Sequence, residues 1–249
     1  MGSTDDARVA LLSRLIDHAP LFPPASLDLP EAVEEDRRAR AHSASFMLGR
    51  FVCPASRLAE LPDVGRGVSV VLDAPLGADS RVVEAIETRP GFDPGAGTPD
   101  AREIYVEVPL DEMLDERLDQ IASYGLRAKV RCGGAAAPDN ETLARFLRAC
   151  VARAVPFKAT AGLHRAVRSN GEHGFLNLLA AVVFGDEEAA LAESDPEAIV
   201  IDSAGFSWRG RHAHAAELVR ARHERLHSIG SCSFFEPVDE LEKLRILPL

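Results

Sequence analysis

The sequence predicts an α/β protein whose fold is an irregular (β/α)8 (TIM-like) barrel with an N-terminal helical extension over residues 1–42. Short runs rich in β-branched and aromatic residues recur along the chain, and several are followed by a segment with helical periodicity. Up to eight strands alternating with helices favour a closed parallel barrel, with an open doubly wound sheet as the alternative. Because no internal repeat or linker divides the 249 residues, we expect a single domain over residues 1–249.

The first forty residues have a helical pattern, and strand patterns follow them. Val9, Leu12 and Ile16 recur at helical spacing and predict a helix that stops at the turn from Pro20 to Pro24. A second, mostly polar helix is expected from Glu31 to Ala41. The expected strands are Phe46–Cys53, Val68–Ala74, Val82–Arg89, Glu103–Leu110, Leu126–Gly133, Pro156–Leu163, Ile199–Trp208 and Ser228–Phe234.

Three of the intervening helices have clear signals. Asp111 can cap a helix that ends before Gly125, and Asp139 or Asn140 can cap the next one. A third helix, from about Gly174 to Phe184, is apolar nearly all round and should be buried.

Two connections make the predicted barrel irregular. Only Pro75 to Arg81 separates the expected second and third strands, which is short for a helical crossover. The segment Ile199–Trp208 is predicted equally well as a local hairpin, because Ser203-Ala204-Gly205 lies between its two apolar halves. The Gly- and Pro-rich stretch Gly91–Asp100 is expected to be a loop near the functional site.

Composition restricts the class of protein. Hydrophobic residues make up 46% of the chain, and no apolar run approaches the length of a transmembrane helix. The formal net charge of −11 repels phosphate backbones, so we expect no nucleic-acid partner and no membrane partner. The acidic N-terminus does not look like a signal peptide. Four scattered cysteines without a CxxC pair indicate reduced thiols in a cytoplasmic protein, and we expect neither a metal nor a cofactor.

Lysine is scarce, and this draws attention to two positions. The chain has 25 arginines and only three lysines, namely Lys129, Lys158 and Lys243. An arginine side chain stays protonated, whereas a buried lysine can lose its proton and act as a base or nucleophile. Lys129 and Lys158 both lie in expected strands, so they are the candidates for lysine chemistry.

Strand alternation predicts that a set of charged residues meets inside the barrel. Outer faces of barrel strands pack against helices and should be apolar, so Glu107, Lys129, Arg131 and Lys158 should point inward, with Glu87 beside them. Acids and bases in a confined space shift one another's pKa values, which is typical of active sites. The alternative is a set of structural ion pairs in a polar core.

Two segments carry a resemblance to a known family. Phe157–Gly162 (FKATAG) resembles the Schiff-base strand of class I aldolases of the deoxyribose-phosphate aldolase type, and Ser228–Ser233 (SIGSCS) is similar to the phosphate-binding last strand of that family. The resemblance implies that Lys158 forms an imine with a carbonyl substrate. It departs at the second lysine, because Lys129 precedes Lys158 whereas the family's second lysine follows the Schiff-base strand.

The resemblance implies a lyase, aldolase or isomerase that acts on a small anionic metabolite bearing a carbonyl group. Lys158 would be the nucleophile, with its pKa lowered by Lys129 or Arg131. Glu107 is the candidate general acid/base, with Glu87 or Asp73 in reserve. The expected substrate-binding residues are Arg131, Thr160, His164, Arg165, Gly230, Ser231 and Ser233. A homo-oligomer is compatible with the sequence.

Two other functional classes remain open. His223-Glu224-Arg225-Leu226-His227 has the HExxH pattern of zinc-dependent hydrolases, which requires both histidines on one helix. Ser233 occupies the third-ligand position, and the surrounding arginines favour a solvated outer helix instead. The third possibility is a non-catalytic barrel that serves as a binding or assembly protein.

Overall fold

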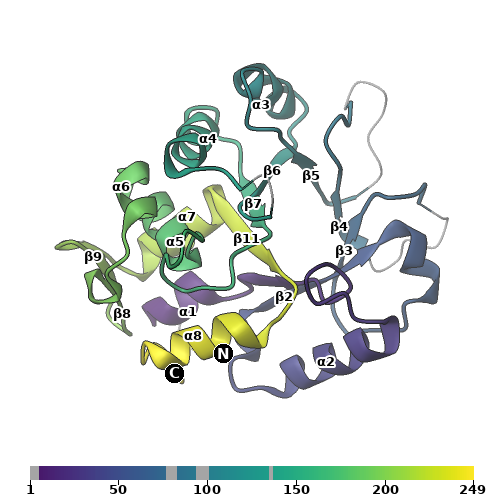
Figure 1. Cartoon of the computed structure of the whole chain (residues 1–249), viewed down its shortest axis with the longest axis horizontal. Coiled ribbons are helices and arrows are strands. Elements are labelled where there is room, and N and C mark those ends of the chain that lie inside the picture. Colours follow the sequence, from purple (N-terminus) through teal and green to yellow (C-terminus); the bar gives the residue numbers. More distant parts are fainter. Residues whose placement is uncertain (1–5, 77–82, 94–100, 135–136) are drawn as a thin grey trace.

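A computed structural model of the chain describes residues 6–76, 83–93, 101–134 and 137–249. Its centre is a closed barrel of eight parallel strands (Figure 1), arranged in chain order around the barrel and closed by the pairing of the last strand with the first. The barrel strands are β1 (Ile16–His18), β2 (Leu48–Pro54), β3 (Val68–Val71), β4 (Val83–Glu87), β5 (Glu103–Glu107), β6 (Arg127–Arg131), β7 (Phe157–Thr160) and β11 (Leu226–Ser231). The predicted α/β barrel is confirmed.

Helices lie around the outside of this barrel (Figure 1). The α-helices of the described residues are α1 (Ala7–Leu12), α2 (Leu29–Ala41), α3 (Leu114–Ser123), α4 (Asn140–Ala152), α5 (Phe175–Phe184), α6 (Glu187–Ala192), α7 (Ala215–Glu224) and α8 (Phe235–Lys243). The short 3-10 helices are η1 (Ser45–Met47), η2 (Ala55–Glu60) and η4 (Pro196–Ala198). None of the helices in these ranges is long and apolar enough to cross a bilayer.

The first barrel strand lies where the sequence predicted helix. The expected helix through Ile16 is wrong, because α1 stops before Arg14, whose φ of 50° interrupts the helical backbone. The chain then extends into β1, which is inserted between β11 and β2. Strand alternation sends His18 outward, where its Nδ1 lies 2.9 Å from Asp36 of α2, and sends Asp17 into the barrel.

The segment predicted either as a strand or as a hairpin is a hairpin. β8 (Ile199–Ile201), β9 (Phe206–Trp208) and β10 (Arg211–Ala213) form a small antiparallel sheet outside the barrel. The other seven expected strands each overlap a barrel strand, and β1 completes the set of eight. Val82 and most of the loop expected at Gly91–Asp100 lie outside the described residues.

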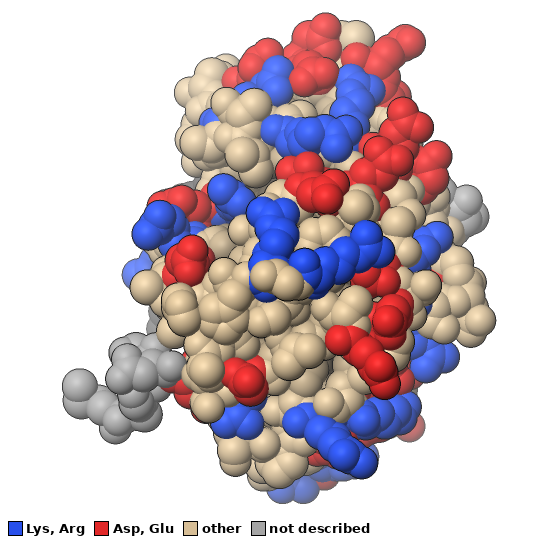
Figure 2. Space-filling view, turned by 90° about the vertical axis from the view of Figure 1, so that its left-hand side faces the viewer, with Lys and Arg blue, Asp and Glu red and all other residues tan. Residues whose placement is uncertain are grey.

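The apolar core lies between the strands and their helices, not inside the barrel. Apolar side chains of the β6 and β7 outer faces, such as Ala128, Val130 and Phe157, pack with α4 residues such as Phe146 in one buried cluster. The predicted cap of α4 is confirmed, because Asp139 accepts the Thr142 N–H at 2.8 Å. Polar and charged side chains occupy much of the barrel interior instead. On the outer surface, Figure 2 shows acidic and basic side chains interspersed over one face.

Two glycines let the carboxyl ends of β6 and β7 approach closely, and this predicts a sharp effect of substitution. A Cβ atom at Gly133 would lie 2.6 Å from the Cα of Gly162. Gly133→Ala should therefore lower the free energy of unfolding by about 3 kcal/mol, the upper end of overpacking costs. Urea denaturation would measure it. Gly125→Ala is the control, because a Cβ atom at Gly125 would meet no atom within 4 Å. This substitution should cost only about 1 kcal/mol, for the left-handed φ of +64° alone. Equal losses would contradict the close approach.

Candidate functional site

The barrel interior is polar, and charged side chains from opposite strands meet in it. Polar side chains that face inward or join this network are Asp17, Ser69, Glu87, Tyr105, Glu107, Lys129, Lys158, Thr160 and Ser228. Of the residues predicted to point into the barrel, Glu87, Glu107, Lys129 and Lys158 lie together there. Arg131, the fifth, is exposed at the end of its strand and does not join them.

Lys158 lies at the centre of this network. Its side chain is 0% exposed, and its Nζ donates hydrogen bonds to Asp17 Oδ2 at 2.7 Å and to Glu87 Oε1 at 2.6 Å. The same Nζ lies 5.5 Å from the centre of the Tyr105 ring, within the range of a cation–π interaction. The ammonium group is thus enclosed by two carboxylates and an aromatic face.

Lys129 extends the network toward β5. β6 and β7 are in register so that Lys129 and Lys158 are direct neighbours. The Nζ of Lys129 lies 2.9 Å from Glu107 Oε2 and 3.6 Å from Glu87 Oε2. Glu87 therefore bridges the two lysines, and an unbroken row of ion pairs runs from Asp17 through Lys158, Glu87 and Lys129 to Glu107.

Neutral donors hold the two carboxylates next to Lys158 in place. Asp17 Oδ2 also accepts the Ser228 hydroxyl at 2.8 Å, and Asp17 Oδ1 accepts the backbone N–H of Arg50 at 2.8 Å. Glu87 Oε1 accepts the Ser69 hydroxyl at 2.8 Å. These bonds stabilise the ionised form of both acids, because a carboxylate that accepts several hydrogen bonds resists protonation.

The electrostatics of Lys158 differ from the sequence-based expectation. Burial alone lowers its pKa, but the charges of Asp17 and Glu87 outweigh burial, and the pKa of Lys158 is raised. The expected lowering by a neighbouring cation is therefore wrong, since two anions lie closer. Burial acts to raise the pKa of Asp17, yet Lys158 and Arg50 bring it down to about 2. The pKa of Glu87 is also lowered, because the two lysines outweigh its burial.

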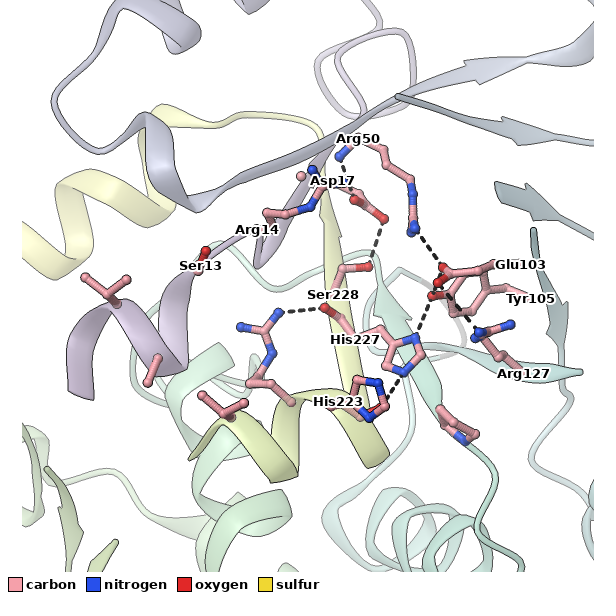
Figure 3. A pocket seen from close by; sticks show the side chains of 16 residues that line it. Ser13, Arg14, Asp17, Arg50, Glu103, Tyr105, Arg127, His223, His227 and Ser228 are labelled. Carbon is pink, nitrogen blue, oxygen red and sulfur yellow. Dashed lines mark hydrogen bonds and ion pairs between the residues drawn. The ribbon is translucent and has the colours of Figure 1, made fainter. Parts of the chain in front are cut away.

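Two cavities touch the ends of this row of ion pairs. A cavity of about 540 Å³ opens at the amino ends of the strands, between α1 and α7, and reaches Asp17 and Ser228 (Figure 3). A smaller cavity of about 330 Å³ lies at the carboxyl end of β5, where Glu107 lines it. The residues that the sequence predicted to bind substrate lie at the carboxyl ends of the strands, but the larger of these two cavities lies at the amino ends.

A second polar cluster lines the amino-end cavity. The Tyr105 hydroxyl lies 2.8 Å from Glu103 Oε2 and 2.8 Å from His227 Nδ1, and His227 Nε2 lies 2.8 Å from the carbonyl oxygen of His223 (Figure 3). That carbonyl can only accept, so Nε2 carries a proton. Burial lowers the pKa of His227 and favours the neutral ring. The Tyr105 hydroxyl has one proton, so it donates a hydrogen bond either to Glu103 or to His227, but not to both.

The residues predicted to bind substrate lie at the carboxyl end and do not line either cavity. Arg131 is exposed at the end of β6 and lies opposite Thr160. The cation opposite Lys158 is Lys129. The Thr160 hydroxyl points to the Val130 carbonyl at 3.3 Å. Gly230 faces Thr160, since a Cβ on this glycine would lie 3.0 Å from Thr160 Cγ2.

Of the remaining predicted binding residues, His164, Arg165 and Ser233 contact α8, and Ser231 bonds to Ser233. His164 Nδ1 lies 2.6 Å from Glu236, and Arg165 lies 3.5 Å from Glu240. The Ser231 hydroxyl donates to the Ser233 carbonyl at 2.7 Å, and the Ser233 hydroxyl accepts the N–H of Glu236. The structure brings these groups together at one end of the barrel, but their hydrogen bonds are made within the protein.

The HExxH segment does not form the helix that a zinc site requires. α7 ends at Glu224 and β11 begins at Leu226, so His223 and His227 belong to different elements. The geometric basis of the metal-dependent hydrolase interpretation is therefore wrong. Within the described ranges, no group of three or more His, Cys, Asp or Glu side chains is placed to hold a metal ion. His212 and His214 lie 3.3 Å apart, but both are exposed.

Sequence analysis missed Asp17, which is the acid closest to Lys158 outside β4. Its strand has only three residues and directly follows a helical pattern, so periodicity could not separate it. The signal that could have found it is an acid directly after the apolar residues Leu15 and Ile16. Asp73, the reserve acid, lies outside the network, where it accepts hydrogen bonds from Ser56.

Removal of Lys158 should destabilise the barrel strongly at neutral pH. Lys158→Met leaves Asp17 and Glu87 buried without their cation, which should cost about 3–5 kcal/mol of unfolding free energy at pH 7. The loss should shrink near pH 4, because both acids can then take up protons. Urea denaturation at both pH values would measure it. Lys243→Met is the matched control, because that side chain is 68% exposed. Equal stability of the two variants at pH 7 would contradict the structural importance of the network.

Acid should weaken the protein through Asp17. Its pKa in the folded state, about 2, lies below its ordinary value of 3.8. Its contribution to stability is therefore complete above pH 4 and is lost as the pH falls through 2. In urea denaturation, the free energy of unfolding of Asp17→Asn should fall less between pH 4 and 2 than that of the wild type. A variant at the exposed Asp239 should show the same fall in unfolding free energy as the wild type. The same slope for Asp17→Asn and the wild type would rule out this contribution.

Comparison with known proteins adds no family assignment. No protein-family model matches the sequence, and a search of curated proteins found no significant match. Function must therefore be inferred from the barrel and its side chains.

Proposed function

We propose that the protein is a lyase of the aldolase type, or an isomerase, that forms an imine between Lys158 and a small anionic carbonyl compound. The observation that supports this most is the position of the Lys158 amine between Asp17 and Glu87, with Lys129 on the other oxygen of Glu87. Two lysines and three carboxylates inside one barrel provide a nucleophile together with several proton donors and acceptors.

Imine formation requires Lys158 to lose a proton first. Both carboxylates at 2.6–2.7 Å can accept that proton when a carbonyl group enters and displaces one of the ion pairs. The free amine then attacks the carbonyl carbon to form a carbinolamine. Loss of its hydroxyl as water, with a proton supplied from Lys129 or Glu107, leaves the positively charged iminium.

The iminium then acts as an electron sink. In the lyase reaction, a carboxylate takes the proton of the substrate's β-hydroxyl, the carbon–carbon bond breaks, and its electron pair moves to the iminium nitrogen to form an enamine. Protonation of the enamine and addition of water release the second product and restore the lysine. In an isomerase, the carboxylate instead removes a proton from carbon and returns it elsewhere. Arg131 and Arg165, both exposed at the carboxyl end, are available to attract an anionic substrate.

A second candidate function is a binding or assembly protein without catalysis. The complete burial of Lys158 and its two short ion pairs favour this candidate, because such a lysine also stabilises a polar core. The two functions differ in whether the amine ever becomes available to a carbonyl compound, and chemical trapping distinguishes them.

Borohydride trapping tests the proposed lysine chemistry. The protein is incubated with pyruvate, acetaldehyde or glyceraldehyde 3-phosphate, reduced with borohydride and mapped by mass spectrometry. We expect one adduct at Lys158, with a yield that rises with pH because the raised pKa of this amine favours its protonated form. Lys158→Met should lose the adduct and Lys243→Met should keep it. Labelling of Lys243 alone, or no labelling at any pH, would support the non-catalytic candidate.

A further inference from the structure

The cavity at the amino end of the barrel has the features of a ligand site separate from the lysine network. Its volume of about 540 Å³ is in the range of small-molecule pockets. Asp17 and Ser228 lie at its inner end, and α1 and α7 form two of its sides. Of the residues that line it, only Asp17 takes part in the proposed imine chemistry, and Tyr105 contacts Lys158. The other lining residues have no role in that chemistry.

Positive charge is in excess in these walls. Arg14, Arg50, Arg127 and Arg222 line the cavity. Asp17, which also lines it, pairs with Lys158, and Lys158 pairs with Glu87 as well. Arg14 and Arg50 share one carboxylate, Glu84, and Arg50 and Arg127 share another, Glu103. The lining thus has four guanidinium groups and two carboxylates, Asp17 and Glu103, and Glu84 pairs with two of the arginines from outside the lining.

Two of these arginines lack a close carboxylate partner. The guanidinium of Arg127 has Glu103 at 3.6 Å, beyond ordinary hydrogen-bond distance, and its buried Nε has no hydrogen-bond partner among the described residues. Arg222 donates only to the backbone carbonyls of Leu11, Leu226 and His227. Its burial lowers its pKa to about 10, so it stays charged at neutral pH.

One side of the cavity is apolar. Val9 and Ala10 of α1, Pro156 before β7 and Val219 of α7 line it. Val219 is 48% exposed, so this apolar side of the cavity is open to solvent. An apolar shelf beside uncompensated guanidinium groups matches a ligand that has an anionic head and an apolar body.

We propose that this cavity binds a small organic monoanion, a carboxylate carried on an aromatic or aliphatic group. The carboxylate is held mainly by Arg127, whose Nε has no partner among the described residues. Arg50, which is also paired with Glu84 and Glu103, lies beside it, and the apolar group covers Val219 and Pro156. Arginine suits this role because its planar guanidinium donates two parallel hydrogen bonds to a carboxylate. Figure 3 shows Arg50 and Arg127 on the two sides of Glu103 and Tyr105.

Isothermal titration calorimetry with benzoate tests this site. Benzoate should bind with one site per chain, and benzyl alcohol and benzylamine, which keep the ring but lack the anion, should not bind measurably. Arg127→Met should weaken benzoate binding at least about 10-fold, as expected for the loss of a charged hydrogen bond. Arg145→Met, an exposed arginine of α4, is the matched control and should bind as the wild type does. Absence of benzoate binding, or equal binding by both variants, would overturn the proposal.

A second pair of variants keeps the test decisive if Arg127→Met does not fold. Val219→Asp places a negative charge on the apolar side of the cavity and should abolish benzoate binding. Val151→Asp introduces the same charge at an exposed valine of α4, which is 44% exposed and outside the cavity, and should leave binding unchanged. Binding that survives Val219→Asp would overturn the proposal. Benzoate has no aldehyde or ketone group, so this result is independent of whether Lys158 forms an imine.

Discussion

The buried ammonium of Lys158 imposes the strongest constraint on this barrel. Removing a charge from water costs several kcal/mol, and close opposite charges offset that cost only when the geometry is good. Here Asp17 comes from β1, Glu87 from β4 and Lys158 from β7, so strands distant around the barrel must close at the correct stagger for the charges to meet. The polar interior and the closed sheet therefore depend on each other.

The same ion pairs that stabilise the barrel oppose the imine chemistry proposed for Lys158. Carboxylates at hydrogen-bond distance keep the Lys158 amine protonated, whereas a nucleophile needs its free electron pair. A carbonyl compound could gain access to the amine only by separating it from Asp17 or Glu87. Stability and reactivity are thus opposed at this one nitrogen. The row of charges as far as Glu107 offers several places to which the displaced proton can move.

Much of the fold could be predicted from the strand patterns in the sequence. Strand alternation also predicted the inward position of Lys129, Lys158 and Glu107, because a barrel strand with an apolar outer face must direct its charges inward. Asp17 could not, since three strand residues are too few to give a period. The direction of the Lys158 pKa shift depends on which charge lies closest, and sequence does not give distances. The zinc-site prediction from the histidine motif was wrong because sequence did not show where the helix ends. α7 ends at Glu224, which separates the two histidines.

Closure of the barrel joins segments that are far apart in the chain. Asp17 bonds to Ser228 across 211 positions and to Lys158 across 141. During synthesis, Lys158 becomes available to Asp17 only after β7 has left the ribosome, and Ser228 only after β11 has done so. Until β11 is added, β1 and β7 present open edges to solvent. Contacts of such long range slow folding. Until the barrel closes, these unpaired edges can associate with strand edges of neighbouring chains.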